Sequence, residues 1–339
     1  MKALVTGSNG FLGVALVHKL LAQGATEVRC LVRQGSALGR LQTMLARHPG
    51  QGEMVVGSLS TKAASARLLE GVDVVYHLAA GMRGTPADLS LNTVVASKRL
   101  LEAVAETRRA VRLVLVSSFS VYGVAGLPWG SVIDEQTPLE AHPERRDAYA
   151  QVKLRQERLF HEYEERHGLP LTVLRPGVIY GPGGSPFSSR VGLSVGGLLL
   201  HFGGGNVLPL SYMDNCADAI ILAGQSDQAT GHAFNVHDDD LPSAREYLRA
   251  YRQRVGPVRS LWVPYPLLRV GARLLEWYNR HSQGQLPAVL TPYRVASSWK
   301  GFRFDNSRLK SLGWRPGVST EQGLAQMFDD LKRNSAGSH

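Results

Sequence analysis

The residue pair with the clearest chemical use is a tyrosine followed four positions later by a lysine, Tyr149 and Lys153. They open a stretch with a helical pattern that continues to about His167, and side chains four apart on a helix share one face. An ammonium group beside a phenol stabilises the phenolate, so we expect Lys153 to lower the pKa of Tyr149 from its usual value of about 10. Such a phenol can give a proton to a carbonyl oxygen, or take one from an alcohol, while hydride moves to or from a nicotinamide. The same spacing also arises by chance on exposed helices, so it needs supporting features.

A serine is predicted beside this pair. Residues 111–116 are almost all apolar, which is typical of a central strand in a parallel sheet, and Ser118 lies two positions past their end. Ligands of such sheets bind at the carboxyl ends of the strands. The Ser118 hydroxyl would therefore hold the same oxygen that Tyr149 protonates.

Three glycines near the N-terminus, Gly7, Gly10 and Gly13, separate a short apolar run from an amphipathic stretch that opens at Val14. This order predicts a strand, a tight turn and a helix. Glycine permits the turn, lets the backbone approach a diphosphate at the helix N-terminus, and lets that helix pack close to the strand. The spacing differs from the commonest dinucleotide fingerprint, and an ordinary glycine-rich turn is the alternative, but the place after an N-terminal strand favours a cofactor site. Residues within the turn are expected to contact the cofactor as well: Asn9, Phe11 and Leu12.

An arginine ends the second predicted strand, at residues 27–32. Arg33 lies 20 positions after Gly13, where dinucleotide folds place the residue that meets the adenosine ribose. An acid there would bind the 2′-hydroxyl of NAD, whereas a guanidinium suits the 2′-phosphate of NADP. Ser36 and Arg40 lie close enough in sequence to assist. A solvated arginine at a strand end is the alternative, and we favour NADP over NAD.

The remaining pattern alternates strands with helices. Strands are predicted at residues 53–56 and 72–78, and helices at 61–71 and 92–108. This alternation predicts an α/β fold with a Rossmann-type, doubly wound parallel sheet. Small residues after the fourth strand let the backbone lie against a flat cofactor ring. The cofactor contacts expected from these two strand ends are Ser58, Leu59, Leu78, Ala79 and Ala80.

Taken together, these motifs resemble the extended short-chain dehydrogenases/reductases, a superfamily of NAD(P)-dependent epimerases, dehydratases and reductases. The matching segments follow the family's order along almost the whole chain, at residues 6–13, 77–80, 92, 117–123, 149–153, 174–182, 212–219 and 304–316. The resemblance implies that Ser118, Tyr149 and Lys153 form the catalytic triad and that Asn92 helps to complete the proton relay. It also implies that Tyr149 and Lys153 contact the cofactor, Lys153 at the ribose.

The resemblance further implies that the segment from Leu78 lies beside the adenosine and that residues around Arg175, including Pro176 and Val178, flank the nicotinamide. One departure is Ser58, where many members have an aspartate that contacts adenine. Serine can still form a hydrogen bond, so only the detail of the adenine contact is affected.

Within the family, two departures narrow the reaction. Phe119 and Ser120 stand where sugar-nucleotide 4,6-dehydratases have Asp-Glu, and residues 177–179 lack the asparagine with which many epimerases bind a substrate diphosphate. Residues 174–183 and 290–294 look more like the 3β-hydroxysteroid dehydrogenase and dihydroflavonol reductase branch. We therefore expect an NADP(H)-dependent oxidoreductase acting on a ketone or secondary alcohol of an apolar small molecule.

Two other functions stay open. A nucleotide-sugar epimerase with tightly bound NAD would use basic residues such as Arg83, Arg145 and Arg190 for a diphosphate. A non-catalytic dinucleotide-sensing protein is disfavoured because its usual signature is loss of Tyr149 or Lys153, and both are present.

The family pattern also predicts a division of the chain. Residues 1–175 would form the dinucleotide-binding domain, with residues 211–236 returning to it. Residues 176–210 and 237–334 would form a smaller, mostly C-terminal substrate-binding lobe, followed by a tail at 335–339.

Two apolar stretches of the lobe predict helices. Residues 191–200 form one candidate, interrupted by two glycines. The other, at 262–278, could pack in the lobe, line an apolar pocket or touch a membrane, and we favour packing. Its helically spaced apolar residues are Leu267, Val270, Leu274, Leu275 and Tyr278.

Composition is that of a globular protein: 339 residues, 44% hydrophobic and 19% charged. The formal net charge of +10 is spread over scattered basic residues, which favours an anionic cofactor or substrate over nucleic acid.

Two cysteines, Cys30 and Cys216, fit a reducing cytoplasm. Because the chain runs directly into its first strand and no apolar segment reaches roughly 18 residues, we expect neither a signal peptide nor a membrane span.

Two further expectations concern metals and assembly. The histidines show no ligand spacing with cysteines or acids, so no metal site is predicted. By resemblance, the helices that start near Asn92 and Tyr149 would form the interface of a homodimer.

Overall fold

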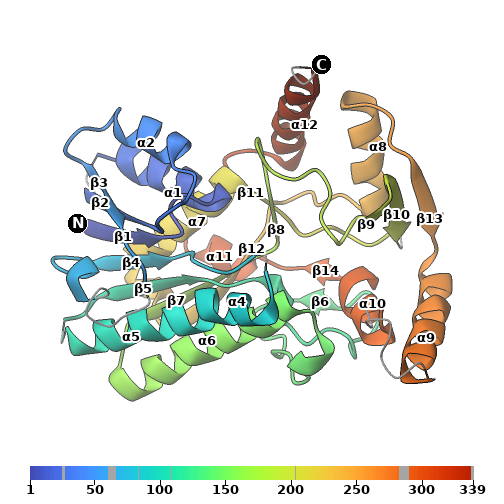
Figure 1. The fold of residues 1–339 in the computed structure, drawn as a ribbon, viewed down its shortest axis with the longest axis horizontal. Coiled ribbons are helices and arrows are strands. Elements are labelled where there is room, and N and C mark those ends of the chain that lie inside the picture. Colours follow the sequence, from blue (N-terminus) through green and yellow to red (C-terminus); the bar gives the residue numbers. More distant parts are fainter. Residues whose placement is uncertain are drawn as a thin grey trace.

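The computed structural model describes residues 1–24, 27–59, 66–82, 84–107, 109–202, 204–281 and 290–336. A seven-stranded sheet, parallel throughout, lies at its centre (Figure 1). In spatial order its strands are β12 (His232–Val236), β7 (Leu171–Pro176), β5 (Arg112–Val116), β4 (Val74–His77), β1 (Lys2–Thr6), β2 (Glu27–Val32) and β3 (Gly52–Val56). The direction of winding reverses between β1 and β4, and such a switch point places a ligand crevice beyond the carboxyl ends of these strands. The predicted α/β fold class is confirmed.

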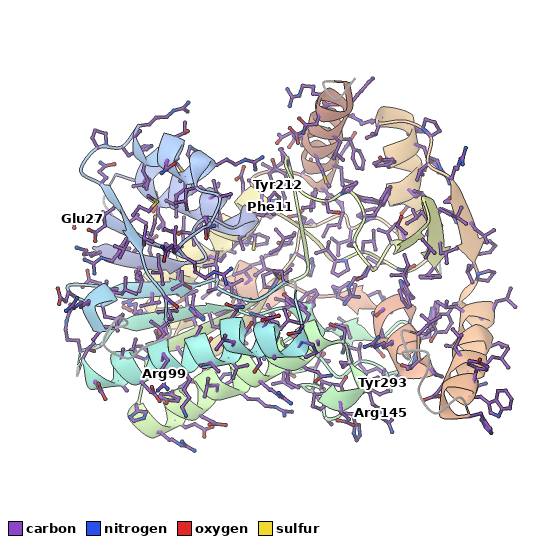
Figure 2. The ribbon with its side chains drawn as sticks, viewed as in Figure 1. Phe11, Glu27, Arg99, Arg145, Tyr212 and Tyr293 are labelled. Atoms are coloured by element: carbon purple, nitrogen blue, oxygen red, sulfur yellow. The ribbon has the colours of Figure 1, made fainter. Side chains whose placement is uncertain are left out.

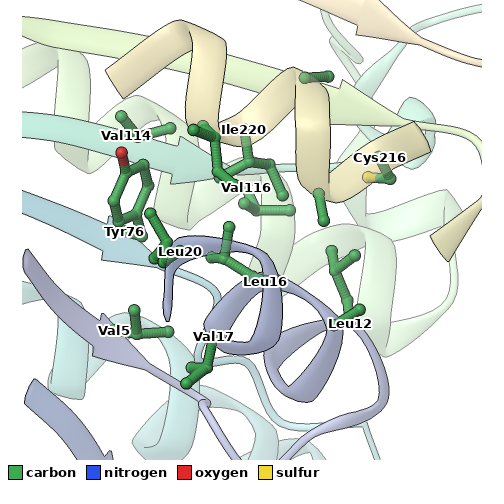
Figure 3. Close-up of a cluster of buried hydrophobic side chains, with 14 of the residues drawn as sticks. Val5, Leu12, Leu16, Val17, Leu20, Tyr76, Val114, Val116, Cys216 and Ile220 are labelled. Atoms are coloured by element: carbon green, nitrogen blue, oxygen red, sulfur yellow. The ribbon is translucent and has the colours of Figure 1, made fainter. Parts of the chain in front are cut away.

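Helices cover both faces of the sheet. α1 (Phe11–Ala22), α2 (Gly39–Leu45) and α7 (Met213–Gln225) share one core with the sheet, which Figure 3 shows around Leu16, Leu20 and Ile220. α5 (Ala96–Glu106) and α6 (Ala148–His167) share the other. Residues 113–116 of β5 alternate between these two cores, which explains why all four are apolar.

Short elements connect these layers. α4 (Pro86–Ser90) continues through a π-helical turn at Leu91–Val95 into α5, so this helical region begins earlier than predicted. The first half of the expected helix at 61–71 lies outside the described residues, and the described half shows helix at 66–68.

The rest of the chain builds around smaller sheets. One core joins β8 (Val178–Tyr180) and β11 (Leu210–Tyr212) to α8 (Ala244–Arg254) and α12 (Thr320–Ala336). β6 (Val132–Ile133) pairs with β14 (Arg303–Phe304), next to α11 (Ser307–Ser311) in sequence. A three-stranded sheet of β9 (Gly192–Val195), β10 (Leu198–Phe202) and β13 (Ser260–Val263) leads to α9 (Tyr265–His281), which packs on α10 (Pro292–Trp299).

The helix predicted at residues 191–200 is wrong. The segment is instead the hairpin of β9 and β10, with Val195 paired to Leu198 across a two-residue turn. Gly196 and Gly197 both have positive φ, at 56° and 79°, which is the backbone that a tight hairpin turn of this type requires. The glycine pair was therefore the informative signal, and the apolar run around it was misleading.

The expectation that the apolar stretch at 262–278 packs inside the lobe is also wrong. Its helix, α9, forms as predicted, but the five apolar residues named for it are all exposed. Leu268 and Ala272 are the side chains that α9 buries, in a cluster with α10. Within the described part of the chain, none of the helices is both long and apolar enough to cross a membrane.

A buried ion pair fastens α6 to the sheet. Glu157 is fully buried, and its Oε1 lies 2.5 Å from Nη2 and 3.0 Å from Nε of Arg175, which lies in β7. Its other carboxylate oxygen accepts a hydrogen bond from the Ser117 hydroxyl, just beyond β5. These contacts satisfy a charge that would otherwise be costly inside the protein.

We predict that Glu157→Ala lowers the free energy of unfolding by about 3–5 kcal/mol, because Arg175 is left as an unpaired buried charge. Urea unfolding measures this change. The matched control on the same helix is Glu165→Ala, which removes an exposed carboxylate and should change the free energy by less than about 1 kcal/mol. Equal effects of the two substitutions would show that the buried pair is not what fastens α6.

Candidate active site

The glycine turn between β1 and α1 leaves no space for side chains. A β-carbon on Gly13 would lie 2.1 Å from the carbonyl oxygen of Gly7, which itself has a φ of +71°. Gly10 begins α1 with an extended backbone and no side-chain cap. The first amide groups of a helix have no partner within it, so this turn offers donors to an anion that can approach the bare backbone. The geometry fits a diphosphate.

A cavity of about 910 Å³ extends from this turn to Tyr149. Ser58 and Leu59 border it after β3, and Val178 borders it from β8. Pro176 ends β7 and is not among the described residues that line the cavity. The nearby Gly177 and Ile179 line the cavity instead. The predicted site residues that line it are Gly7, Asn9, Gly10, Phe11, Leu12, Gly13, Arg33, Ser58, Leu59, Leu78, Ala79, Ala80, Asn92, Ser118, Tyr149, Lys153 and Val178.

Arg33 and Asn92 meet in this cavity. The exposed Arg33 donates from Nη1 to Oδ1 of Asn92 at 2.7 Å, and the Asn92 amide donates to the Asp88 carbonyl at 2.8 Å. Asn92 is thereby placed beside the strand-end arginine, and its part in a proton relay stays a prediction. The Arg40 guanidinium lies against Gly183, outside the described lining of the cavity.

Lys153 is held from two sides by oxygen atoms. Its ammonium is 2% exposed and donates to the Val116 carbonyl at 2.7 Å and to Oε1 of Gln156 at 2.5 Å. Burial lowers the pKa of Lys153 to about 7, although the nearby Glu157 carboxylate opposes this shift. A lysine in this state can exchange its proton near neutral pH.

The pKa of the Tyr149 phenol is raised, whereas the sequence predicts that it is lowered. Burial raises its pKa, and the hydrogen bond with Ser118 only partly opposes that effect. Lys153 faces Val116 and Gln156 instead, so the prediction that it lowers the pKa of Tyr149 is wrong for this arrangement. The tyrosine is therefore a proton donor near neutral pH, with the Ser118 hydroxyl beside it.

Sequence reasoning missed a buried polar chain behind Lys153. The Gln156 amide donates to Ser97 Oγ at 2.8 Å, and that hydroxyl lies 2.9 Å from Nε2 of His77. The other nitrogen of His77, Nδ1, lies 2.9 Å from the hydroxyl of Thr6, directly before the glycine turn. Burial lowers the pKa of His77 to about 3, so the imidazole is neutral. The sequence signal for this chain is the presence of polar residues on strand and helix faces that are otherwise apolar.

Two arginines line the other side of the cavity, near Ser118. Arg146 was missed; it is 7% exposed and donates to the Tyr122 carbonyl at 3.1 Å and to Glu140 at 3.3 Å. The second is Arg190, whose pKa is lowered to about 10 by burial and by the neighbouring Arg146 guanidinium.

Of the other basic residues proposed for a diphosphate, Arg145 lies over the Tyr293 ring at 5.5 Å, outside the described lining (Figure 2). Arg83 is outside the described residues. Sequence pattern does not distinguish two adjacent arginines, so it could not predict that Arg146, and not Arg145, lines the cavity.

The pKa of Lys153 gives the protein a testable pH dependence. Between about 7 and the ordinary value of 10.5, the unfolded lysine still binds a proton that the folded one has lost. Stability therefore rises with pH in this window, by roughly 1.4 kcal/mol per pH unit, and the dependence vanishes on either side of it. We predict that the stability difference between the wild type and Lys153→Met, from urea unfolding, follows this slope. A difference that stays flat from pH 7 to pH 10.5 would contradict it.

Comparison with known proteins finds relatives whose sequences align with nearly the whole chain. A ketoreductase of a farnesylated dihydroquinoline oxide from Stigmatella aurantiaca is 26% identical over 331 residues, covering 96% of this chain and 95% of its own. A 2-alkyl-3-oxoalkanoate reductase from Stenotrophomonas maltophilia is 27% identical over 350 residues, covering 99% and 100%. Among solved structures, the UDP-glucuronic acid 4-epimerase of Bacillus cereus in complex with NAD matches with a TM-score of 0.73 at 22% identity, over 98% of this chain and 99% of that one.

The sequence pattern of a recognised family covers most of the chain, including the glycine turn, Ser118 and the Tyr149–Lys153 pair. Its match extends over residues 3–236, from β1 to β12. The protein therefore belongs to the NAD dependent epimerase/dehydratase family and is an enzyme of the extended short-chain dehydrogenase/reductase type.

Proposed function

We propose that the protein is an NADP(H)-dependent oxidoreductase that interconverts a ketone and a secondary alcohol of an apolar small molecule. The observation that carries the proposal is one cavity with the glycine turn at one end and Ser118, Tyr149 and Lys153 at the other. The relatives from Stigmatella and Stenotrophomonas, which are named as a ketoreductase and an oxoalkanoate reductase, support a carbonyl substrate.

The cofactor would lie along this cavity. The glycine turn, which a β-carbon would fill, would hold the diphosphate, and the segment from Leu78 would lie beside the adenosine. Arg33 would bind a 2′-phosphate, and Lys153 the nicotinamide ribose. When bound, the cofactor supplies or accepts the hydride.

The protein's own residues handle the proton and the oxygen. Ser118 would hold the carbonyl oxygen, and the Tyr149 phenol would give it a proton. Burial raises the pKa of the Tyr149 phenol, which keeps it in the protonated form that can give a proton to a carbonyl oxygen. Lys153, with a pKa of about 7, is suited to pass a proton near neutral pH.

We predict that Tyr149→Phe lowers kcat for ketone reduction by about 10²- to 10⁴-fold, because the proton donor is lost. NADPH oxidation with a panel of apolar ketones, including a 2-alkyl-3-oxoalkanoate, measures the effect. NADPH binding, followed by fluorescence titration, should persist. The control on the same helix is Tyr163→Phe, whose ring contacts His167. Full activity of Tyr149→Phe would remove the acid/base assignment.

The choice of NADP rests on Arg33. We predict that Arg33→Asp raises the Kd for NADPH by about 10- to 100-fold, because a charge-assisted hydrogen bond to the 2′-phosphate is lost, and leaves NADH binding no weaker. Arg47→Asp, at an exposed position after α2, controls for the change in net charge. If NADPH affinity does not change, NAD becomes the better assignment.

A nucleotide-sugar epimerase with bound NAD is the second candidate. Arg146 and Arg190 favour it, because two guanidinium groups beside the reacting end suit a diphosphate. Glu140 already pairs with Arg146, which reduces the positive charge available to a dianion. The cofactor released when the purified protein is denatured separates the two candidates: stoichiometric NAD would support the epimerase.

We also propose a cytoplasmic homodimer. The buried free thiols of Cys30 and Cys216 suit a reducing compartment. α5 and α6 lie side by side on one face of the sheet and would form the dimer interface (Figure 1). Light scattering after size-exclusion chromatography tests the assembly, and a monomer at all concentrations would exclude it.

A further inference from the structure

The outer face of α9 is an apolar surface on an otherwise charged molecule. Six side chains form it, each between 48% and 63% exposed. Val270, Leu274 and Trp277 lie on the side of the helix away from Leu268 and Ala272, which anchor α9 to α10, and Leu275 lies at the edge next to the anchors. We call this surface the α9 ridge: Leu267, Val270, Leu274, Leu275, Trp277 and Tyr278.

Exposed aromatic residues extend the surface at the start of α9. Trp262 in β13 is 51% exposed, and Trp129 is 60% exposed with its ring 5.3 Å from that of Tyr265. An apolar area of this kind on a soluble protein marks an interaction surface. Tryptophan and tyrosine are the residues that favour the boundary between water and lipid.

Positive charge is concentrated in the same part of the chain. Residues 245–281 contain eight arginines against two glutamates, so they supply +6 of the formal net charge of +10. Arg269 and Arg273 are exposed along one flank of the ridge, and Arg259 is exposed on the chain leading into β13. α8, β13 and α9, which hold most of this segment, follow one another along the right-hand edge of Figure 1. The net charge of the chain is thus concentrated in the segment that contains α9.

We propose that α9 lies on the surface of an anionic lipid bilayer, with the α9 ridge at the level of the headgroups and the upper acyl chains. An amphipathic helix with large apolar residues on one face and arginines beside them is the form that binds in this plane. Each arginine near an anionic leaflet adds about 1 kcal/mol of attraction, and its apolar stem can follow the ridge into the interface.

The charge pattern favours lipid over a second copy of the chain. A two-fold dimer through the α9 ridge would bring Arg269 and Arg273 near the same arginines of the second copy, and like charges at an interface cost energy. An anionic bilayer instead complements both the apolar and the positive part of the surface. Since α10 packs on α9 and supplies Ser298 to the cavity lining, bilayer contact would also bring the substrate end of the cavity near the membrane.

Co-sedimentation of the full chain with phosphatidylcholine vesicles, with and without phosphatidylglycerol, tests this proposal. We expect the wild type to pellet with the anionic vesicles and to be released by high salt. Leu274→Glu and Trp277→Glu should each weaken the partitioning by at least about tenfold, because an apolar side chain that would enter the bilayer is replaced by a charge. The matched control is Val56→Glu, an equally exposed apolar residue at the end of β3, which should bind like the wild type.

Three outcomes would overturn the proposal. The wild type could stay in solution with every vesicle, or the two α9 variants could pellet as the wild type does. Light scattering could also show a dimer that Leu274→Glu dissociates, in which case a second copy covers the ridge. Thermal melting of each variant checks that its fold is intact, and a blue shift of tryptophan fluorescence on adding anionic vesicles reports contact without sedimentation. None of these readouts requires a substrate, so they stand apart from the proposed reaction.

Discussion

The structure depends on how α6 buries polar side chains against the sheet. Lys153, Gln156 and Glu157 all lie in the interior, where an unsatisfied polar or charged group is costly. Their partners sit around the carboxyl ends of β5 and β7, at the Val116 carbonyl, Ser117 and Arg175. Because these contacts fix both the position and the rotation of α6, Tyr149, one turn earlier, is held at the cavity beside Ser118.

The same constraint links the two ends of the cavity. From Lys153 a chain of buried hydrogen-bonding groups passes through Gln156, Ser97 and His77 to Thr6. Thr6 is the last residue of β1 and directly precedes the glycine turn. The residues that would hold a diphosphate and those that would move a proton therefore belong to one connected interior. A rigid interior of this kind suits a reaction in which two reactants must be aligned.

Much of this arrangement could be predicted because it follows from backbone rules. Gly7, Gly10 and Gly13 were informative because only glycine fits where strand and helix backbones nearly touch. Ser118 and Tyr149 could be placed because parallel strands end at one edge of the sheet. The sequence could not predict the direction in which a side chain points from a known backbone position. Asn92 turns toward Arg33, and Arg146 rather than Arg145 enters the cavity, although each alternative fits the same helix or loop.

Two apolar runs gave wrong predictions of different kinds. The run at residues 191–200 predicted a helix, and the run in α9 predicted packing in the lobe. In the first, two left-handed glycines turn the chain into a hairpin. In the second, the helix forms but most of its apolar face stays exposed in the described part of the chain. Local patterns report which conformation a segment adopts, whereas burial depends on what the rest of the chain brings to it.

The most direct test of the central claim follows the hydride. The protein would be incubated with NADPH deuterated at the reactive position of the nicotinamide and with a 2-alkyl-3-oxoalkanoate, alongside separate reactions with other apolar ketones and with UDP-glucose. We predict that a ketone is converted to an alcohol carrying one deuterium, with one NADP⁺ formed per alcohol, and that Tyr149→Phe forms this alcohol at least about 10²-fold more slowly. Conversion of UDP-glucose to its 4-epimer with no net oxidation of NADPH, and no labelled alcohol from any ketone, would contradict the assignment as a reductase.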